Sequence, residues 1–292
     1  MTTGFSMTDF VADLNTLIDK GEDLPTLPNT ILELRTALDD DMSGDRKIAD
    51  IIGRDPVITG KLLRVANSVA YSRGVEVTSV LNAVQRVGRR EVRVICVVLA
   101  VVNAFPGTKN SLDLKQFWDH SAAVGRVAQL LCRKLQLQGA AGADDVYVGG
   151  LLHDVGILLM SQFFPDQLKE ILVVRAETGG PLWRAEKQVI GMCHGQVGSL
   201  LTARWSLPES INICISGHHV PEEAPAEYEH ACRILRASEA LCTSMGAGVD
   251  VEGDADDDAF NALSALEMPD DQIESVLGDI EEVGVSVRGL FA

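Results

Sequence analysis

The chain has 292 residues, of which 46% are hydrophobic and only 5% aromatic. This is enough apolar material for one large domain or two ordinary ones, with a core of Leu, Val, Ile and Ala that favours packing of helix on helix. The net charge of −17 gives a surface that repels phosphate backbones, so we expect no direct binding to nucleic acid.

The six cysteines form no CxxC pair, which favours reduced, buried thiols in a cytoplasmic protein. Zinc ligation by thiolates is the alternative. Acidic residues interrupt the first 20 positions, so no secretory signal is expected. The longest apolar run, Val92–Phe105, is broken by Arg93 and Asn103 and is too short to cross a bilayer. It predicts a buried helix, and we expect no membrane association.

The N-terminal block, residues 1–110, is predicted to be a helical subdomain, because its apolar residues recur at helical spacing. Its helix starts carry recognisable caps, with Ser43 and Asp55 as candidate N-caps and Pro56 at a first helical position. The spacing places helices at 5–20, from about 29 or 30, after Ser43, after Asp55, from Thr78 or Ser79 to Gly88, and at 89–105.

The second block, residues 111–245, continues the helical pattern, and strand-like alternation is almost absent. We therefore predict an all-α protein in which the N-terminal subdomain packs on a larger multi-helix core. Helices are expected at 112–135, around 146–153, and at 165–177, 182–203, 208–217 and 228–245. Residues 246–292 are predicted to be an acidic linker with a short helix at about 270–282 that adds little to the core.

Five of the six histidines fall in four short phrases, which points to a site because histidine is both a neutral metal ligand and a proton carrier near pH 7. Each phrase lies on a different predicted helix or at its end, as in the metal sites of helical bundles. The candidate metal ligands are His120 in FWDHS, His153 and Asp154 in GLLHDVG, His194 in GMCHGQVG, His218 and His219 in ISGHH, and Glu239 in RASEALC.

This mixture of nitrogen and oxygen ligands suits one or two divalent ions, namely Fe, Mn or Zn. Asp154 is the only candidate able to bridge two ions. The structural alternatives stay open at this point: Asp154 could fix the tautomer of a neighbouring histidine, His218 and His219 could face a helix C-terminus, and Glu239 could be exposed. If these alternatives hold, the residues bind no ion. His230 follows two glutamates and is predicted to lie on the surface.

The order His, His-Asp, His, His-His and an acid, over residues 112–245, resembles the HD superfamily of metal-dependent phosphohydrolases. Its HD-GYP branch hydrolyses cyclic dinucleotides, but the chain departs from that branch. Ile157 stands where those enzymes carry lysine, no Gly-Tyr-Pro phrase follows His219, and the last acid is Glu239 where aspartate is usual. The resemblance therefore implies the fold without the full set of elements for catalysis.

A closer resemblance is to the HDOD domain, the HD-related output domain, over residues 20–245. It rests on LPTLP at 24–28, IIGRDPVITGKLLRVANS at 51–68, VTSVLNAVQRVG at 77–88, the FWDHS, GLLHDVG and GMCHGQVG phrases, Glu186, and ARWSLPESI at 203–211. The resemblance implies a bacterial signal-transduction output module that acts through contacts with signalling proteins and is not catalytic. The alternatives are a metal-dependent phosphohydrolase acting on a nucleotide or phosphodiester, and a sensor that binds a metal or nucleotide without turnover.

Overall fold

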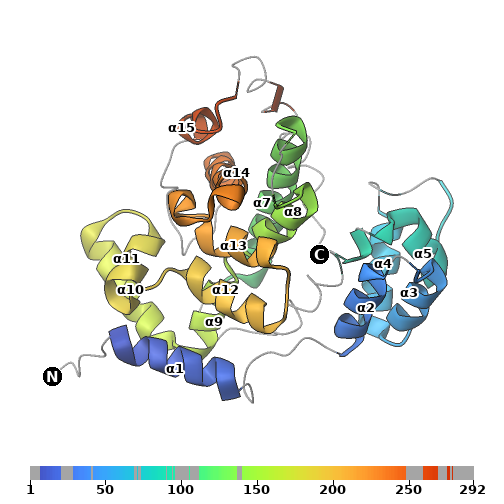
Figure 1. The fold of residues 1–292 in the computed structure, drawn as a ribbon, viewed down its shortest axis with the longest axis horizontal. Helices are drawn as coiled ribbons and strands as arrows, with labels where there is room; N and C mark the ends of the chain where they lie inside the picture. The colour runs from blue at the N-terminus through green and yellow to red at the C-terminus, as the bar shows by residue number, and fades with distance from the viewer. Residues whose placement is uncertain are drawn as a thin grey trace. The chain divides into compact units, whose positions relative to one another are not determined.

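The structure is a computed structural model that describes residues 7–20, 29–40, 42–68, 71, 74–89, 91–93, 95, 105, 112–136, 140–247, 259–268, 275–276 and 278. Every regular element within these ranges is a helix, which confirms the all-α prediction (Figure 1). The chain divides into two compact units. One comprises residues 25–106, and the other comprises residues 1–24 together with 107–292.

The unit of residues 25–106 holds four described helices, α2 (Asn29–Asp39), α3 (Asp45–Ile52), α4 (Pro56–Ala66) and α5 (Val80–Val87). Helix α3 packs on α2 and α5, and α4 packs on α5. Two caps confirm the sequence prediction, because Asp55 Oδ1 accepts from the Ile58 amide at 3.1 Å and Ser79 Oγ from the Asn82 amide at 3.2 Å. Helix α3 begins one residue later than predicted, with Gly44 as its N-cap.

The larger unit is built around a set of mutually packed helices that bring the histidine phrases together. Helix α7 packs on α8 and α14, α13 packs on α8, α12 and α14, and α9 packs on α12. The bounds are α1 (Met7–Lys20), α7 (Leu114–Lys134), α8 (Ala143–Leu152), α9 (Val155–Phe163), α10 (Pro165–Thr178), α11 (Leu182–Ile190), α12 (His194–Arg204), α13 (Glu209–Gly217), η1 (Pro221–Glu223), α14 (Ala226–Cys242), η2 (Thr243–Ala247) and α15 (Ala259–Ser264).

The first helix belongs to the larger unit, which differs from the predicted boundary at residue 110. Phe10 and Leu14 of α1 are buried, and the Phe10 ring lies 4.8 Å from the ring of Phe164. The apolar spacing of α1 predicted a helix correctly, but spacing along one helix does not say which other helix its apolar face contacts.

Two further differences concern helix ends beside the histidines. The predicted helix 182–203 is two helices, α11 and α12, because Gly191 ends α11 in the left-handed conformation with φ 79°. Helix α9, absent from the prediction, begins directly after Asp154. Residues 155–160 are all buried, so the segment lacks the apolar periodicity that marks a surface helix.

The stretch Ala143–Phe163 is apolar and long enough by composition to be a candidate membrane span. However, 89% of that window is buried inside the protein, and the stretch is two helices, α8 and α9, separated by His153 and Asp154. It is therefore a buried part of the core. The apolar run Val92–Phe105, predicted to be a buried helix, lies mostly outside the described residues.

The described part of the tail packs on the core, contrary to the prediction for residues 246–292. Leu263, Leu266, Met268 and Val276 are buried in the same apolar cluster as Leu131 of α7 and residues of α14. Helix α15 contacts α14 directly. Of the predicted helix at 270–282, only residues 275, 276 and 278 are described, and these are helical.

We expect Leu263→Ala to lower the free energy of unfolding by about 2–5 kcal/mol, because it removes a buried side chain from a packed cluster. Urea unfolding measures the loss. Asn261→Ala, at an exposed position of the same helix, is the control and should change stability by about 0.5 kcal/mol or less. Equal stability of the two variants would mean that α15 is not part of the folded core.

Candidate metal centre

The histidine phrases lie at helix ends that converge inside the larger unit. His153 ends α8, Asp154 precedes α9, and His194 is the first residue of α12. His218 and His219 directly follow α13. The sixth residue, His120, lies within α7 and is buried like the others.

Three of these residues form a first group. His120, His153 and Asp154 each offer a ligand atom, and the three atoms lie within 4.8 Å of one another. His153 Nε2 lies 3.0 Å from Asp154 Oδ2, and His120 Nε2 lies 3.8 Å from the same oxygen. All three side chains are at most 1% exposed, so this group is enclosed by protein.

His194, His218 and His219 form a second group, with ligand nitrogens again within 4.8 Å of one another. Asp154 joins the two groups, because its Oδ1 lies 3.2 Å from His194 Nε2 while its Oδ2 faces the first group. The six residues predicted from their phrases are thus brought together, with Asp154 between the two groups.

Two of the histidines have their tautomer set by the backbone. His153 Nδ1 lies 2.6 Å from the Gly150 carbonyl oxygen, and His218 Nδ1 lies 2.6 Å from the Ile215 carbonyl oxygen. A carbonyl only accepts, so each Nδ1 carries the proton and each neutral ring keeps its Nε2 lone pair for the site. His218 Nε2 is buried and makes no hydrogen bond to any described residue.

Glu186 of α11 is a functional residue that was absent from the predicted ligand set. It is fully buried, and its carboxylate accepts from the His194 amide at 2.7 Å and from His194 Nδ1 at 2.8 Å. A carboxylate that holds the far nitrogen of a ligating histidine is typical of metal sites. In the sequence, Glu186 lies eight residues before His194 and was noted only as part of the HDOD resemblance, because nothing local shows that its carboxylate reaches a histidine.

The surroundings give these histidines different protonation states. Burial lowers the pKa of His194, but the carboxylates of Glu186 and Asp154 outweigh burial and raise the pKa well above its usual value. Burial and the neighbouring imidazoles lower the pKa of His218 and His219 well below the usual value. The proton between His194 Nε2 and His219 Nε2, which lie 2.8 Å apart, therefore belongs to His194.

Glu239 of α14 does not join either group. Its Oε2 lies 3.9 Å from His219 Nδ1, and the carboxyl side chain is 14% exposed. Its charge nevertheless reaches the cluster, because it helps to raise the pKa of His153. Six of the seven predicted ligands therefore form the two groups, and Glu239 lies beside them. His230, also on α14, is exposed as predicted.

Glycine allows the helices to approach closely enough for these contacts. A Cβ at Gly156 would come within 2.8 Å of the His194 carbonyl carbon and 2.9 Å of the Gly198 nitrogen. A Cβ at Gly195 would meet the Ile215 carbonyl at 2.6 Å and the His218 ring at 2.8 Å. Backbone-to-backbone contact between α9 and α12 thus holds Asp154 against His194.

Gly156→Ala should destabilise the protein by about 1–3 kcal/mol or more, because the methyl group meets backbone atoms that can move only with α12. Thermal unfolding measures the change. The control is Gly60→Ala, within α4, where an added Cβ meets nothing within 4 Å and replacing glycine in a helix interior favours folding. A Gly156→Ala protein as stable as Gly60→Ala would contradict the close approach.

Glu186→Gln is expected to lower the pKa of His194, because the substitution removes the charge while keeping a group of the same shape. Histidine NMR titration of protein treated with a chelator measures it. Glu223→Gln, which removes an exposed carboxylate 3.6 Å from Lys187, is the control and should leave the His194 titration unchanged. An unaltered titration in Glu186→Gln would show that Glu186 does not set the protonation of His194.

The chemistry of the six residues fits a divalent ion. Two imidazoles are held with Nε2 toward the interior, and one carboxylate reaches both groups. Bonds from such an ion to nitrogen or carboxylate oxygen are about 2.0–2.2 Å long. The ligand atoms of each group lie within 4.8 Å of one another, so a single ion can lie between them at that distance. An ion bound to the second group must displace the proton on His194, since a protonated nitrogen has no lone pair to donate.

The family of this chain is shown by its sequence. The chain belongs to the HDOD domain family, whose family model matches residues 24–221. It is 26% identical over 213 residues to an uncharacterized protein of Treponema pallidum. The match covers 73% of this chain and 41% of that protein, so the chain spans about two fifths of its relative's length.

Solved structures agree with this assignment. An HDOD domain protein of unknown function from Geobacter sulfurreducens shares 26% identity and a TM-score of 0.76, covering 96% of this chain and 99% of that one. A Shewanella amazonensis protein, provisionally named a phosphohydrolase, shares 25% identity and a TM-score of 0.68. The match covers 96% of this chain and 91% of that one. A Marinobacter aquaeolei protein, provisionally named a signal transduction protein, has the same fold, with 18% identity and a TM-score of 0.77. The match covers 99% of this chain and 66% of that one.

Proposed function

We propose that this protein is a signal-transduction module that acts through contacts with partner proteins and carries one or two divalent ions in its histidine–aspartate cluster without turning over a substrate. The observation that carries the proposal is a cluster of six possible ligand side chains that lie close together and yet are enclosed. Apart from His219 at 7% exposure, each of the six side chains is at most 1% exposed.

Enclosure bears on catalysis because hydrolysis requires a phosphoryl oxygen and a water molecule to reach the ion together. In the described structure a phosphodiester would have to displace buried helix ends to do so. A small ion has no such requirement, and it replaces the charge of the His194 proton that otherwise compensates Glu186 and Asp154. The cluster is therefore better suited to holding an ion as part of the fold than to admitting a substrate.

The second candidate function is a metal-dependent phosphohydrolase. It is supported by the position of Asp154, whose two oxygens face different ligand groups, since paired ions with a shared carboxylate are typical of phosphoryl hydrolysis. The provisional name of the Shewanella amazonensis neighbour points in the same direction. The absence of the lysine at Ile157 and of a Gly-Tyr-Pro phrase argues for the first proposal.

Elemental analysis of the purified protein tests the metal. We expect Fe, Mn or Zn in the wild-type protein, and we expect Asp154→Ala to lose it, because Asp154 contacts both groups. His230→Ala, which removes an exposed histidine outside the cluster, should keep the wild-type metal content. Equal metal content in Asp154→Ala and His230→Ala would place the metal elsewhere, and a metal-free wild-type protein that takes up none of these ions would refute the proposal.

Turnover is tested separately with bis(p-nitrophenyl) phosphate and cyclic dinucleotides, each in the presence of added Mn²⁺ or Fe²⁺. The proposal predicts that the wild-type protein and His153→Ala release product at the same background rate. Turnover that His153→Ala abolishes would instead establish the phosphohydrolase, because His153 lies in the first ligand group and its Nε2 faces Asp154.

A further inference from the structure

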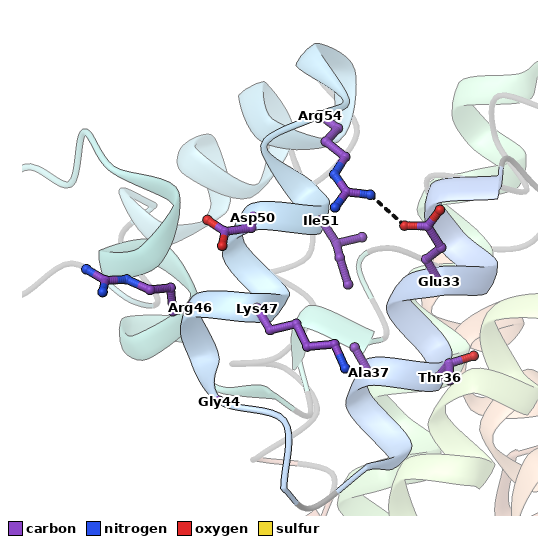
Figure 2. Close-up of a pocket in the computed structure, with 9 residues that line it drawn as sticks. All are labelled: Glu33, Thr36, Ala37, Gly44, Arg46, Lys47, Asp50, Ile51 and Arg54. Atoms are coloured by element: carbon purple, nitrogen blue, oxygen red, sulfur yellow. Dashed lines mark hydrogen bonds and ion pairs between the residues drawn. The ribbon is translucent and has the colours of Figure 1, made fainter.

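The pocket between α2 and α3 is not a route to the histidine–aspartate cluster. It has a volume of about 660 Å³, and all its lining residues belong to the unit of residues 25–106. Figure 2 shows Arg54 of α3 joined to Glu33 of α2 at 2.7 Å, so cations and carboxylates of the same unit lie side by side in it. The access of an ion to the cluster is therefore a property of the larger unit.

Among the six cluster residues, His219 is the one that solvent reaches most. Its side chain is 7% exposed, whereas the other five are at most 1% exposed. Its ring also links the cluster to its surroundings, because Nε2 lies 2.8 Å from His194 Nε2 while Nδ1 lies 3.9 Å from the carboxylate of Glu239, which is 14% exposed. An ion that passes His219 therefore has the least protein to displace.

Trp183 covers the ring at this point of access. The two ring centres lie 5.8 Å apart and the ring planes differ by 18°, so the indole is stacked on the His219 imidazole. Trp183 is the second residue of α11 and is itself half-buried. A stacked indole shields the imidazole face that it covers from solvent and from an incoming ion. The most accessible residue of the cluster is thus closed by a side chain that offers no metal ligand.

A weak ion pair holds Trp183 in this position. Lys187, one turn after Trp183 on α11, has its Nζ 5.3 Å from the centre of the indole ring and 3.6 Å from the carboxylate of Glu223. Glu223 belongs to η1, four residues after His219, so the pair joins α11 to the segment that carries His219. The Glu223 side chain is 59% exposed, and exposed pairs contribute little to stability. The contact closes the indole over His219 without locking it there.

Two glycines directly before α11 provide a hinge for Trp183. Gly179 and Gly180 have φ values of 71° and 85°, and a Cβ on either would meet nothing within 4 Å, so this connection is open to solvent. Helix α11 itself packs on α10 and α1 (Figure 1). Exposed loop positions at the end of an element can absorb the backbone rotation of a hinge. The first turn of α11 can therefore tilt while the rest of the helix stays packed.

We propose that Trp183 is the gate of the histidine–aspartate cluster, and that a divalent ion enters and leaves past His219. In the closed position the indole is stacked on His219 and the ion is enclosed. In the open position the first turn of α11 has moved at the preceding glycines, while Glu186, one turn later, still holds His194. The inference rests on the proposed function, because it assigns the route by which the ion of that proposal is exchanged.

The first test measures access to His219 in metal-free protein. Diethyl pyrocarbonate modifies histidines that solvent reaches, and mass spectrometry gives the rate for each residue, with the exposed His230 as the internal reference. Trp183→Ala should speed the modification of His219 about tenfold relative to His230, because the stacked ring is removed. Trp183→Phe, which keeps a flat ring, and Gln188→Ala, at an exposed position of α11, are the controls and should react nearly as the wild type does.

Equal rates for His219 in Trp183→Ala and in the wild type would overturn the gate, as would equal acceleration by Gln188→Ala. Circular dichroism and thermal unfolding show whether each variant is folded. Trp183→Leu is the milder variant, because it keeps an apolar side chain at the half-buried position but has no ring to stack on His219. It should also speed the modification, and a folded Trp183→Leu protein with the wild-type rate would contradict the proposal.

The second test follows the exchange of Zn²⁺. Release into an excess of a chromogenic chelator gives koff, and uptake from a weak chelator gives kon. A gate covers the empty and the filled cluster alike, so Trp183→Ala should raise both rate constants by the same factor, about tenfold, and leave Kd unchanged. Trp183→Phe should exchange Zn²⁺ nearly as the wild type does. Faster release alone, with a weaker Kd, would make Trp183 a positioning residue for His219 and overturn the gate.

Failure of this inference is distinct from failure of the proposed function. A wild-type protein that takes up none of the expected ions would refute the proposed function, while the modification of metal-free His219 still decides whether Trp183 controls access. Metal uptake with the same kon and koff in Trp183→Ala and in the wild type would refute the gate and leave the proposed function standing.

Discussion

One buried carboxylate, that of Asp154, constrains the arrangement of the larger unit. It is fully buried at the junction of α8 and α9 and lies 3.0 Å from His153, 3.2 Å from His194 and 3.8 Å from His120. A buried charge is costly unless partners surround it, so helices α7, α8 and α12 must all present an imidazole at this point. Gly156, the second residue of α9, lets the backbone of α12 come close enough to do so.

The same carboxylate explains how the cluster holds a proton and why a divalent ion would fit in its place. Glu186 and Asp154 hold a proton on His194, and burial keeps His218 and His219 neutral with lone pairs available. A divalent ion supplies the same compensating charge and adds bonds to the neutral nitrogens. Under the proposed function, metal uptake would exchange one form of charge compensation for another.

The sequence by itself determined the all-α class, most helix bounds and the six histidine and aspartate residues that converge, because helical spacing, caps and rare histidines beside Asp or Gly are local signals. It did not reveal α9, whose residues are buried on every side and lack a period, or the break at Gly191 that places His194 at a helix start. Only the tertiary structure decided that α1 packs on the larger unit through Phe10, that the tail buries Leu263, and that Glu186 holds His194. Each of these depends on which surfaces meet across long separations in the chain, and no pattern within a single helix carries that information.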